Sequence, residues 1–239
     1  MIGLGTIVNT LAVAAGGIAG LIIKKGLNEN IQDTLMKALG LATLFIGLSG
    51  ALTGLIYIEN GVIKTCGSML MIMSLVIGSI IGEFIDIENK LEILGEKIKN
   101  AVKVKGDNKF VEGFVTNALV ICIGAMAVVG SLQDGLNHDP SMLYAKAVLD
   151  CIISMVFAAT LGVGVIFAGA VLFVYQGSIT LLAAVIAPFL SDTLINNISY
   201  IGSVLIFGVG VNLVFGKKIK VGNMLPALLV PVVYEILFL

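Results

Sequence analysis

Apolar residues fill about eight separate stretches of this chain, each close to the roughly 20 residues of a helix that crosses a bilayer. Hydrophobic residues make up 58% of the 239 residues and charged residues only 12%, a balance too apolar for a soluble domain of this size. These proportions exclude a soluble enzyme, a nucleic-acid-binding domain and a secreted domain held by disulfide bonds. The predicted fold class is therefore all-α, a polytopic bundle of transmembrane helices.

The limits of the apolar stretches predict where these helices lie. The expected ranges are 2–23, 34–57, 66–86, 110–132, 142–163, 165–190, 198–215 and 223–238. Residues 142–190 form one apolar run that only Gly162-Val163-Gly164 interrupts. That tripeptide is either a tight turn between two spans or a kink in one broken helix. No basic region precedes the first stretch, which we interpret as a span rather than a signal peptide.

All 14 basic residues are Lys, and their placement predicts the topology because cytoplasmic loops are enriched in Lys and Arg. With eight spans, the connections after the first, third and seventh helices all lie on one side. They contain Lys24, Lys25, Lys90, Lys97, Lys99, Lys103, Lys105, Lys109, Lys217, Lys218 and Lys220. The opposite side receives Lys64 and Lys146. We therefore expect a multi-pass protein of the cytoplasmic (inner) membrane with both termini outside.

The connection at residues 87–109 is the one substantial polar segment between the predicted spans. Its apolar residues recur at helical spacing and its other face is charged. The apolar positions are Ile87, Leu91, Leu94, Ile98 and Ala101. This pattern predicts an amphipathic helix in the cytoplasmic headgroup region. It is either a solvated connector between two halves or a regulatory helix that binds a partner.

Two parts of the chain resemble each other. Asn9-Thr10-Leu11 matches Asn117-Ala118-Leu119, and the series continues with Gly26-Leu27-Asn28 against Gly135-Leu136-Asn137 and Lys37-Ala38-Leu39 against Lys146-Ala147-Val148. Three helices pair with the next three. Because three is an odd number, the second copy crosses the membrane in the opposite orientation to the first, as in many secondary transporters. The predicted organisation is a first repeat at 1–86, the connector at 87–109, the inverted repeat at 110–190 and two further helices at 191–239. The repeat could also serve only to build a symmetric bundle.

Asp150 is the strongest candidate for a functional side chain, because a charge within a transmembrane segment is costly and is rarely kept without a role. It lies one turn after Lys146 and one turn before Ser154, on one face of the fifth predicted helix. Its equivalent in the first repeat is Leu41, so the symmetric fold does not require the charge. Asp150 is either the partner of Lys146 in a structural ion pair or part of a solute or proton site.

Asn9 and Asn117 are equivalent in the repeat, and each lies early in its predicted helix. Such amides either hydrogen-bond neighbouring helices together or offer a ligand their carbonyl oxygens or N–H groups. Gln176 and Ser178 form a polar interruption beside a glycine in the sixth predicted helix, where backbone can approach a ligand. We therefore place Asn9, Asn117, Asp150 and Gln176 at a substrate or ion site.

Several further polar residues are candidates for support or coupling at that site. They are Lys146, Ser154, Ser178, Glu112 and Asn212. We expect no metal or cofactor, because the cysteines stand in separate segments and the single histidine has no partner residues near it. These residues are Cys66, Cys122, Cys151 and His138. No catalytic residue is predicted, and the chain is not expected to be an enzyme.

Four strings in the sequence are distinctive. They are Gly3-Leu4-Gly5-Thr6-Ile7-Val8-Asn9, Ile77-Gly78-Ser79-Ile80-Ile81-Gly82-Glu83, the segment from Gly124 to Leu136, and Asn223-Met224-Leu225-Pro226-Ala227-Leu228. With these strings the chain resembles, over essentially its whole length, the bacterial membrane family catalogued as domain of unknown function 554. The resemblance implies a bacterial membrane architecture and no established binding or catalytic residue.

The leading hypothesis is a secondary transporter of a small solute or ion that works by alternating access between the two repeats. Asn9, Asn117 and Gln176 would contact the substrate, and Asp150 would carry a proton or a coupling cation. The expected partners are the lipid bilayer and the solute or ion; glycine-rich helix faces would permit a homodimer without requiring one, and nucleic acid is excluded. The alternative is an ion channel, or a membrane scaffold that recruits a partner through the helix at 87–105.

Overall fold

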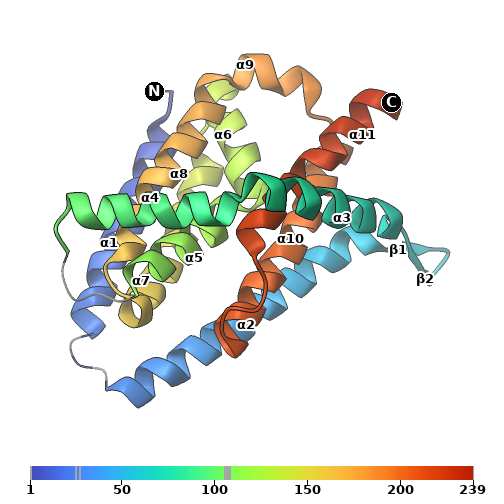
Figure 1. The fold of residues 1–239 in the computed structure, drawn as a ribbon. Helices are drawn as coiled ribbons and strands as arrows, with labels where there is room; N and C mark the ends of the chain where they lie inside the picture. The colour runs from blue at the N-terminus through green and yellow to red at the C-terminus, as the bar shows by residue number, and fades with distance from the viewer. Residues whose placement is uncertain (1, 25, 27, 105–108, 239) are drawn as a thin grey trace. The chain divides into compact units, whose positions relative to one another are not determined.

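The computed structural model describes residues 2–24, 26, 28–104 and 109–238 (Figure 1). Lys25 and Lys105 of the predicted cytoplasmic loops lie outside the described residues, as do Leu27 of the repeat and residues 106–108 of the connector. Within the described residues the regular secondary structure is helical apart from one β-hairpin. The predicted helical class is thus correct for nearly all of the described chain.

Six helices are long and apolar enough to cross a membrane, counting only the residues that the structure describes. They are α1 (Leu4–Lys24), α2 (Glu29–Leu55), α3 (Ser68–Ile85), α7 (Ser141–Leu161), α8 (Gly164–Leu181) and α10 (Asp192–Phe215). A seventh candidate span is the bent pair α5 (Phe110–Cys122) and α6 (Ala125–Asn137). The membrane architecture is confirmed, and the count of eight stays a prediction.

The fourth predicted helix, 110–132, is wrong as a single helix. It breaks after Cys122, and α5 and α6 meet at an angle of 62°. The backbone at Ile123 and Gly124 is extended, so the helical hydrogen bonds stop there. The second half then continues to Asn137, five residues beyond the predicted end at 132, and His138 in the left-handed conformation terminates it.

The run at 142–190 resolves into separate helices. α7 ends at Leu161 and α8 begins at Gly164, and Gly162 has a φ of 90°, a conformation that favours glycine. The tripeptide is therefore a turn between two helices rather than a kink in one. Past α8 the chain forms only short turns of helix, α9 (Ala183–Ile186) and the 3-10 helix η1 (Ala187–Phe189).

The last predicted helix, 223–238, is also corrected. The chain forms a 3-10 helix, η2 (Val221–Leu229), followed by a short α-helix, α11 (Val230–Phe238). Pro226 lies inside η2 and Pro231 in the first turn of α11. Because proline has no N–H to donate, Pro226 opposes a regular α-helix through this stretch, whereas Pro231 is tolerated in a first turn.

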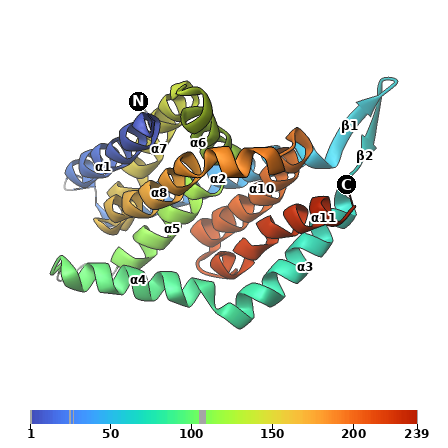
Figure 2. The same ribbon diagram turned by 90° about the horizontal axis from the view of Figure 1, so that it is seen from above.

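A β-hairpin replaces the end of the second predicted helix. Strands β1 (Ile56–Glu59) and β2 (Val62–Thr65) pair in antiparallel fashion, and Asn60-Gly61 forms the turn. Both turn residues have positive φ, 53° and 76°, as expected for the Asn-Gly turn of a tight hairpin. The hairpin projects from the end of α2 beside the start of α3 (Figure 2).

The chain divides into two compact units, which are residues 1–39 with 91–189 (unit 1) and residues 40–90 with 190–239 (unit 2). In unit 1, α1 packs along α7 and α8 (Figure 1). A Cβ at Gly16 or Gly20 would lie 2.1 or 2.0 Å from a backbone oxygen of α7. These small residues allow the close packing. The repeats at 1–86 and 110–190 divide the chain differently, and their equivalence stays a prediction.

In unit 2, α3 packs against η2, and the second half of α2 packs against α10. A Cβ at Gly47 would lie 2.4 Å from the backbone nitrogen of Phe207, so these two helices also approach closely. Tyr200, Ile201 and Ala227 form a buried apolar cluster in this unit. The connector helix α4 (Ile87–Ala101) begins in unit 2 and ends in unit 1.

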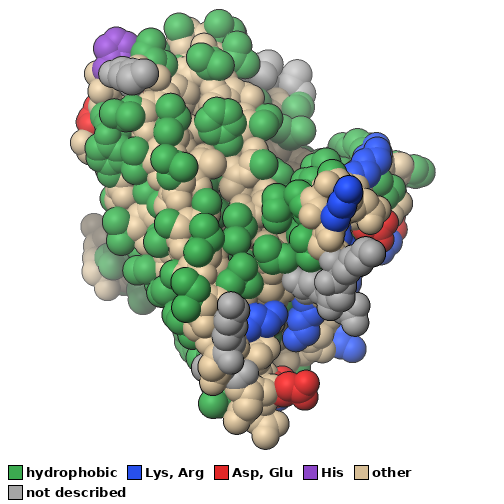
Figure 3. Space-filling view, turned by 90° about the vertical axis from the view of Figure 1, so that its left-hand side faces the viewer, with side chains coloured by type: hydrophobic (Ala, Val, Ile, Leu, Met, Phe, Trp, Pro, Cys, Tyr) green, Lys and Arg blue, Asp and Glu red, His purple; other side chains and the backbone are tan. Residues whose placement is uncertain are grey.

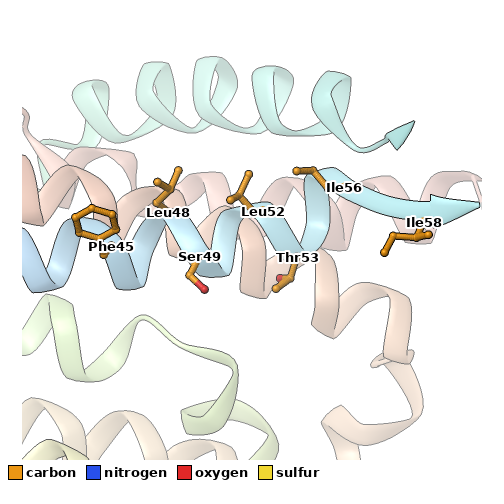
Figure 4. Close-up of a pocket in the computed structure, with 7 residues that line it drawn as sticks. All are labelled: Phe45, Leu48, Ser49, Leu52, Thr53, Ile56 and Ile58. Carbon is orange, nitrogen blue, oxygen red and sulfur yellow. The ribbon is translucent and has the colours of Figure 1, made fainter. Parts of the chain in front are cut away.

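Large apolar side chains cover much of the outer surface. Phe84 is 88% exposed and Leu181 is 80% exposed, and in the space-filling view hydrophobic side chains dominate the face while charged ones gather at its edges (Figure 3). A shallow hollow of about 470 Å³ lies along α2 and β1; Leu48 and Leu52 point to one side of α2, and Ser49 and Thr53 to the other (Figure 4). Such surfaces suit lipid as the solvent.

Candidate functional site

Three predicted site residues meet in the interior of unit 1. The side-chain nitrogen of Asn9, on α1, donates to Oδ2 of Asp150, on α7, at 3.0 Å and to Oε1 of Gln176, on α8, at 3.3 Å. Asn9 and Gln176 are 0% exposed and Asp150 is 3% exposed. All three helices are candidate spans. The structure thus joins three separate membrane helices through one buried polar group.

Lys146 completes this group, which we call the Asn9–Asp150 cluster (Asn9, Lys146, Asp150 and Gln176). Its ammonium lies 2.5 Å from Oδ2 of Asp150 and donates to the carbonyl of Ile121 at 2.8 Å. That carbonyl belongs to the last turn of α5, where the break leaves carbonyls without helical donors and gives the helix end a partial negative charge. The break in the fourth helix therefore holds the ammonium.

The ion pair is not explained by helix formation. An acidic residue four positions before Lys supports a helix better than the reverse order, and here Lys146 precedes Asp150. Exposed pairs of this kind contribute about 0.3–0.5 kcal/mol. Both side chains are instead buried, at 7% and 5% exposed, where an unpaired charge would cost several kcal/mol. The two charges need each other because they are buried.

Asn117, on α5, belongs to a second buried polar group. This group includes Ser154, which lies on α7 one helical turn after Asp150. Its side-chain nitrogen donates to Oγ of Ser154 at 3.1 Å and to the carbonyl of Val165 at 3.1 Å. Its oxygen accepts from the same serine hydroxyl at 3.4 Å. Asn117 therefore links α5, α7 and α8, but the contacts do not join it directly to Asn9. Its two partners fit the interhelical role that was left open for it.

Two polar atoms of the Asn9–Asp150 cluster have no partner among the described residues, namely Oδ1 of Asn9 and Nε2 of Gln176. Turning either amide over would not satisfy them. A reversed Asn9 would place its oxygen against the Asp150 carboxylate and the Gln176 oxygen, all acceptors. A buried polar atom without a partner costs about 1–3 kcal/mol. The cluster thus offers one acceptor and one donor that a bound molecule could use.

Three predicted residues lie elsewhere. The Ser178 hydroxyl is exposed and donates to the carbonyl of Val174 at 2.6 Å. Glu112 is exposed in the first turn of α5. Asn212 belongs to unit 2, where its oxygen accepts from the amides of Lys218 and Ile219 and shapes the loop after α10. The structure does not bring these side chains to the Asn9–Asp150 cluster.

Asp134 is a buried carboxylate that the sequence analysis missed. It is 0% exposed, and its Oδ2 accepts from the backbone N–H of Gly5 at 3.1 Å. Because the fourth helix was predicted to end at 132, Asp134 was assigned to a loop. A helix continued to Asn137 places this charge within a candidate span, and the rule that selected Asp150 would then have selected Asp134 as well.

Unit 2 contains its own polar group, at one end of α3. The amide of Asn223 accepts from the backbone N–H of Glu88 and donates to Glu83, each at 2.7 Å. Glu88 pairs with Lys217, and Glu83 with Lys220. The hydrogen bond from Lys220 to Glu83 raises the pKa of that lysine. Its carboxylates and amide are all partnered, so we interpret this group as a clamp between α3 and η2.

The four distinctive strings of the sequence form two pairs in space, one in each unit. The string that begins at Gly3 meets the string 124–136 through Gly5 and Asp134. The string that ends at Glu83 meets the string 223–228 through Asn223. The strings that carry the resemblance therefore contact each other through hydrogen bonds between distant parts of the chain.

The long apolar helices, the lipid-suited surface and the buried polar interior define a polytopic membrane protein. The chain belongs to the family described as protein of unknown function (DUF554), whose model matches residues 4–236. The resemblance drawn from the four strings is thereby confirmed.

Two relatives extend over nearly the same length. The chain is 36% identical over 227 residues to "Uncharacterized membrane protein YdfK" of Bacillus subtilis (strain 168), covering 95% of this chain and 93% of that one. It is 29% identical over 230 residues to "Uncharacterized protein YqgA" of Escherichia coli (strain K12), with the same coverage of 95% and 93%. No solved structure matches the chain.

Proposed function

We propose that this protein is a secondary transporter of a small polar solute across the bacterial cytoplasmic membrane, with the Asn9–Asp150 cluster as its binding site. The observation that carries the proposal is a buried ion pair with two amides, contributed by three candidate spans, in which one acceptor and one donor are unused. A buried polar group of this size is expensive in a membrane, and a ligand that uses the free atoms accounts for its cost.

The free atoms indicate the chemistry of the solute. Oδ1 of Asn9 accepts a hydrogen bond and Nε2 of Gln176 donates one, so the solute carries a donor and an acceptor close together. The adjacent ammonium and carboxylate balance each other, so a solute that brings opposite charges, or none, leaves the net charge of the site unchanged. A solute with one uncompensated charge fits less well.

The proposed mechanism is alternating access. Discontinuous helices are frequent at the sites of secondary transporters, and the α5–α6 break lies beside the cluster through the contact of Ile121 with Lys146. Movement at this break would open the cluster to either side. The proposal includes both termini outside the membrane, and it assigns no catalytic activity. Glycine faces that would permit a homodimer pack within one chain, as Gly16 and Gly20 do against α7, so they do not support one.

A second candidate function is a scaffold that recruits a partner through α4. The observation in its favour is that Ile93 and Leu94 on this helix are 42% and 41% exposed. Lipid headgroups would cover such side chains equally well. A binding partner that copurifies only with the intact helix would support the scaffold.

The direct test is solute uptake into proteoliposomes, after a screen of polar metabolites for those that raise the melting temperature of the purified protein. We expect the Gln176→Met variant, which keeps the side-chain volume but lacks the amide, to bind the selected solute about tenfold or more weakly. Ser178→Ala on the same helix is the control and should transport normally. Equal uptake by Gln176→Met and Ser178→Ala would contradict the assigned site, and steady ionic current without solute uptake would support a channel.

A further inference from the structure

A second carboxylate in unit 1 lies apart from the Asn9–Asp150 cluster. Asp134 on α6 is 0% exposed, and among the described residues one hydrogen bond, from the N–H of Gly5 to Oδ2, holds it. Its other oxygen, Oδ1, has no partner in the part of the chain that the structure describes. This differs from Asp150, whose charge Lys146 balances.

A buried carboxylate with one neutral donor is a poorly satisfied anion. The N-terminus of α1, where Gly5 lies, contributes a partial positive charge of roughly half an elementary charge. Taking an unpaired carboxylate out of water costs more free energy than such a partial charge returns. The helix end therefore does not balance the charge, and a cation beside Oδ1 would do so.

Further oxygen atoms lie near the sequence neighbours of Asp134 and of its hydrogen-bond partner Gly5. Thr6 follows Gly5, and its hydroxyl lies 3.5 Å from the hydroxyl of Thr180 on α8; both residues are buried. Gly135 follows Asp134, and a Cβ there would lie 2.4 Å from the carbonyl oxygen of Thr180. The helices α1, α6 and α8 thus bring one carboxylate, two hydroxyls and a carbonyl to the same region.

We propose that Asp134, Thr6 and Thr180 form a binding site for a monovalent hard cation, and that Na⁺ is its ligand. Oxygen atoms from carboxylate, hydroxyl and carbonyl groups are the donors that hard cations prefer. A single carboxylate balances a single positive charge, whereas divalent ions are usually held by more acidic groups. The cation would supply the positive charge that Oδ1 lacks.

Binding at this site does not require the proposed transport. A role for Na⁺ as the coupling ion would rest on the proposed function, and in that case Asp134 would replace Asp150 as the coupling carboxylate. Lys146 already neutralises the charge of Asp150, whereas no cationic side chain is shown to pair with Asp134 among the described residues.

The test is the melting temperature of the purified full-length protein in NaCl or choline chloride at equal ionic strength, together with binding of radioactive ²²Na⁺. We expect a saturable rise in melting temperature with Na⁺. Asp134→Asn, which keeps an oxygen to accept from Gly5, should abolish the rise, and Thr180→Val should weaken Na⁺ binding by about tenfold. Glu112→Gln, an exposed carboxylate in the same unit, is the control and should leave Na⁺ binding unchanged.

Other outcomes are equally decisive. If the wild-type protein melts identically in both salts and binds no ²²Na⁺, the site is not a sodium site. If its melting temperature responds to pH but not to Na⁺, and Asp134→Asn removes that response, Asp134 holds a proton and the proposal is overturned. Because these measurements need no solute, a failure here leaves solute uptake and the Gln176→Met result unaffected. If Asp134→Asn does not fold, ²²Na⁺ binding to the wild type and to Thr180→Val decides.

Discussion

Replacing Lys146 with Met is expected to lower the free energy of unfolding by about 3–5 kcal/mol, because it leaves the Asp150 charge buried without its partner. The carbonyl of Ile121 also loses its ammonium donor. Met has nearly the same length as Lys, so little packing volume is lost. The measurement is thermal unfolding of the purified protein in detergent, which should show a melting temperature well below that of the wild type.

The double variant Lys146→Met with Asp150→Leu separates lost charge balance from lost packing. With both charges removed no unbalanced charge remains, Asn9 keeps the oxygen of Gln176 as an acceptor, and most of the stability should return. Lys37→Met is a matched control, since Lys37 forms an ion pair with Asp33 at the same four-residue separation but is exposed. It should change stability by no more than about 1 kcal/mol. Equal losses from Lys37→Met and Lys146→Met would show that burial of the pair has no energetic consequence.

The centre of the candidate site could be predicted from the sequence because polar side chains are rare inside membrane helices. Asn9, Asp150 and Gln176 each interrupt an apolar stretch, and that rarity selected them. Rarity does not give contacts, however, so it could not separate Asn117, which binds Ser154, from the cluster that includes Asn9. It also failed at Asp134, where an error of five residues in a helix end moved a buried charge into a loop.

For the fold, the sequence likewise predicted the main elements but not their interruptions. Runs of apolar residues located the long helices, since hydropathy reports on burial in lipid. The α5–α6 break was not visible, because Gly124 is tolerated in an apolar helix and the extended backbone there is supported by a distant contact, from Lys146 to Ile121. The hairpin carried a local signal in Asn60-Gly61, which was overlooked because an apolar stretch was taken to continue as helix.

Gly82→Ala is expected to produce the other large loss, by disrupting the contact between α3 and η2. A Cβ at this position would lie 1.7 Å from the backbone oxygen of Asn223, so one of the two elements must move. Displacing η2 would also break the hydrogen bonds of Asn223 with Glu83 and Glu88. Overpacking usually costs about 1–3 kcal/mol, and the lost hydrogen bonds add about 0.5–1.5 kcal/mol each.

Gly177→Ala on α8 is the matched control, because it makes the same substitution within a candidate span where a Cβ meets nothing within 4 Å. Alanine favours a helix over glycine by about 1 kcal/mol, so this variant should melt at or above the wild-type temperature. The two variants therefore have opposite expected signs for one chemical change. If the Gly82→Ala protein had the same melting temperature as Gly177→Ala, α3 and η2 would not pack closely. The clamp formed by Asn223 would then have no structural basis.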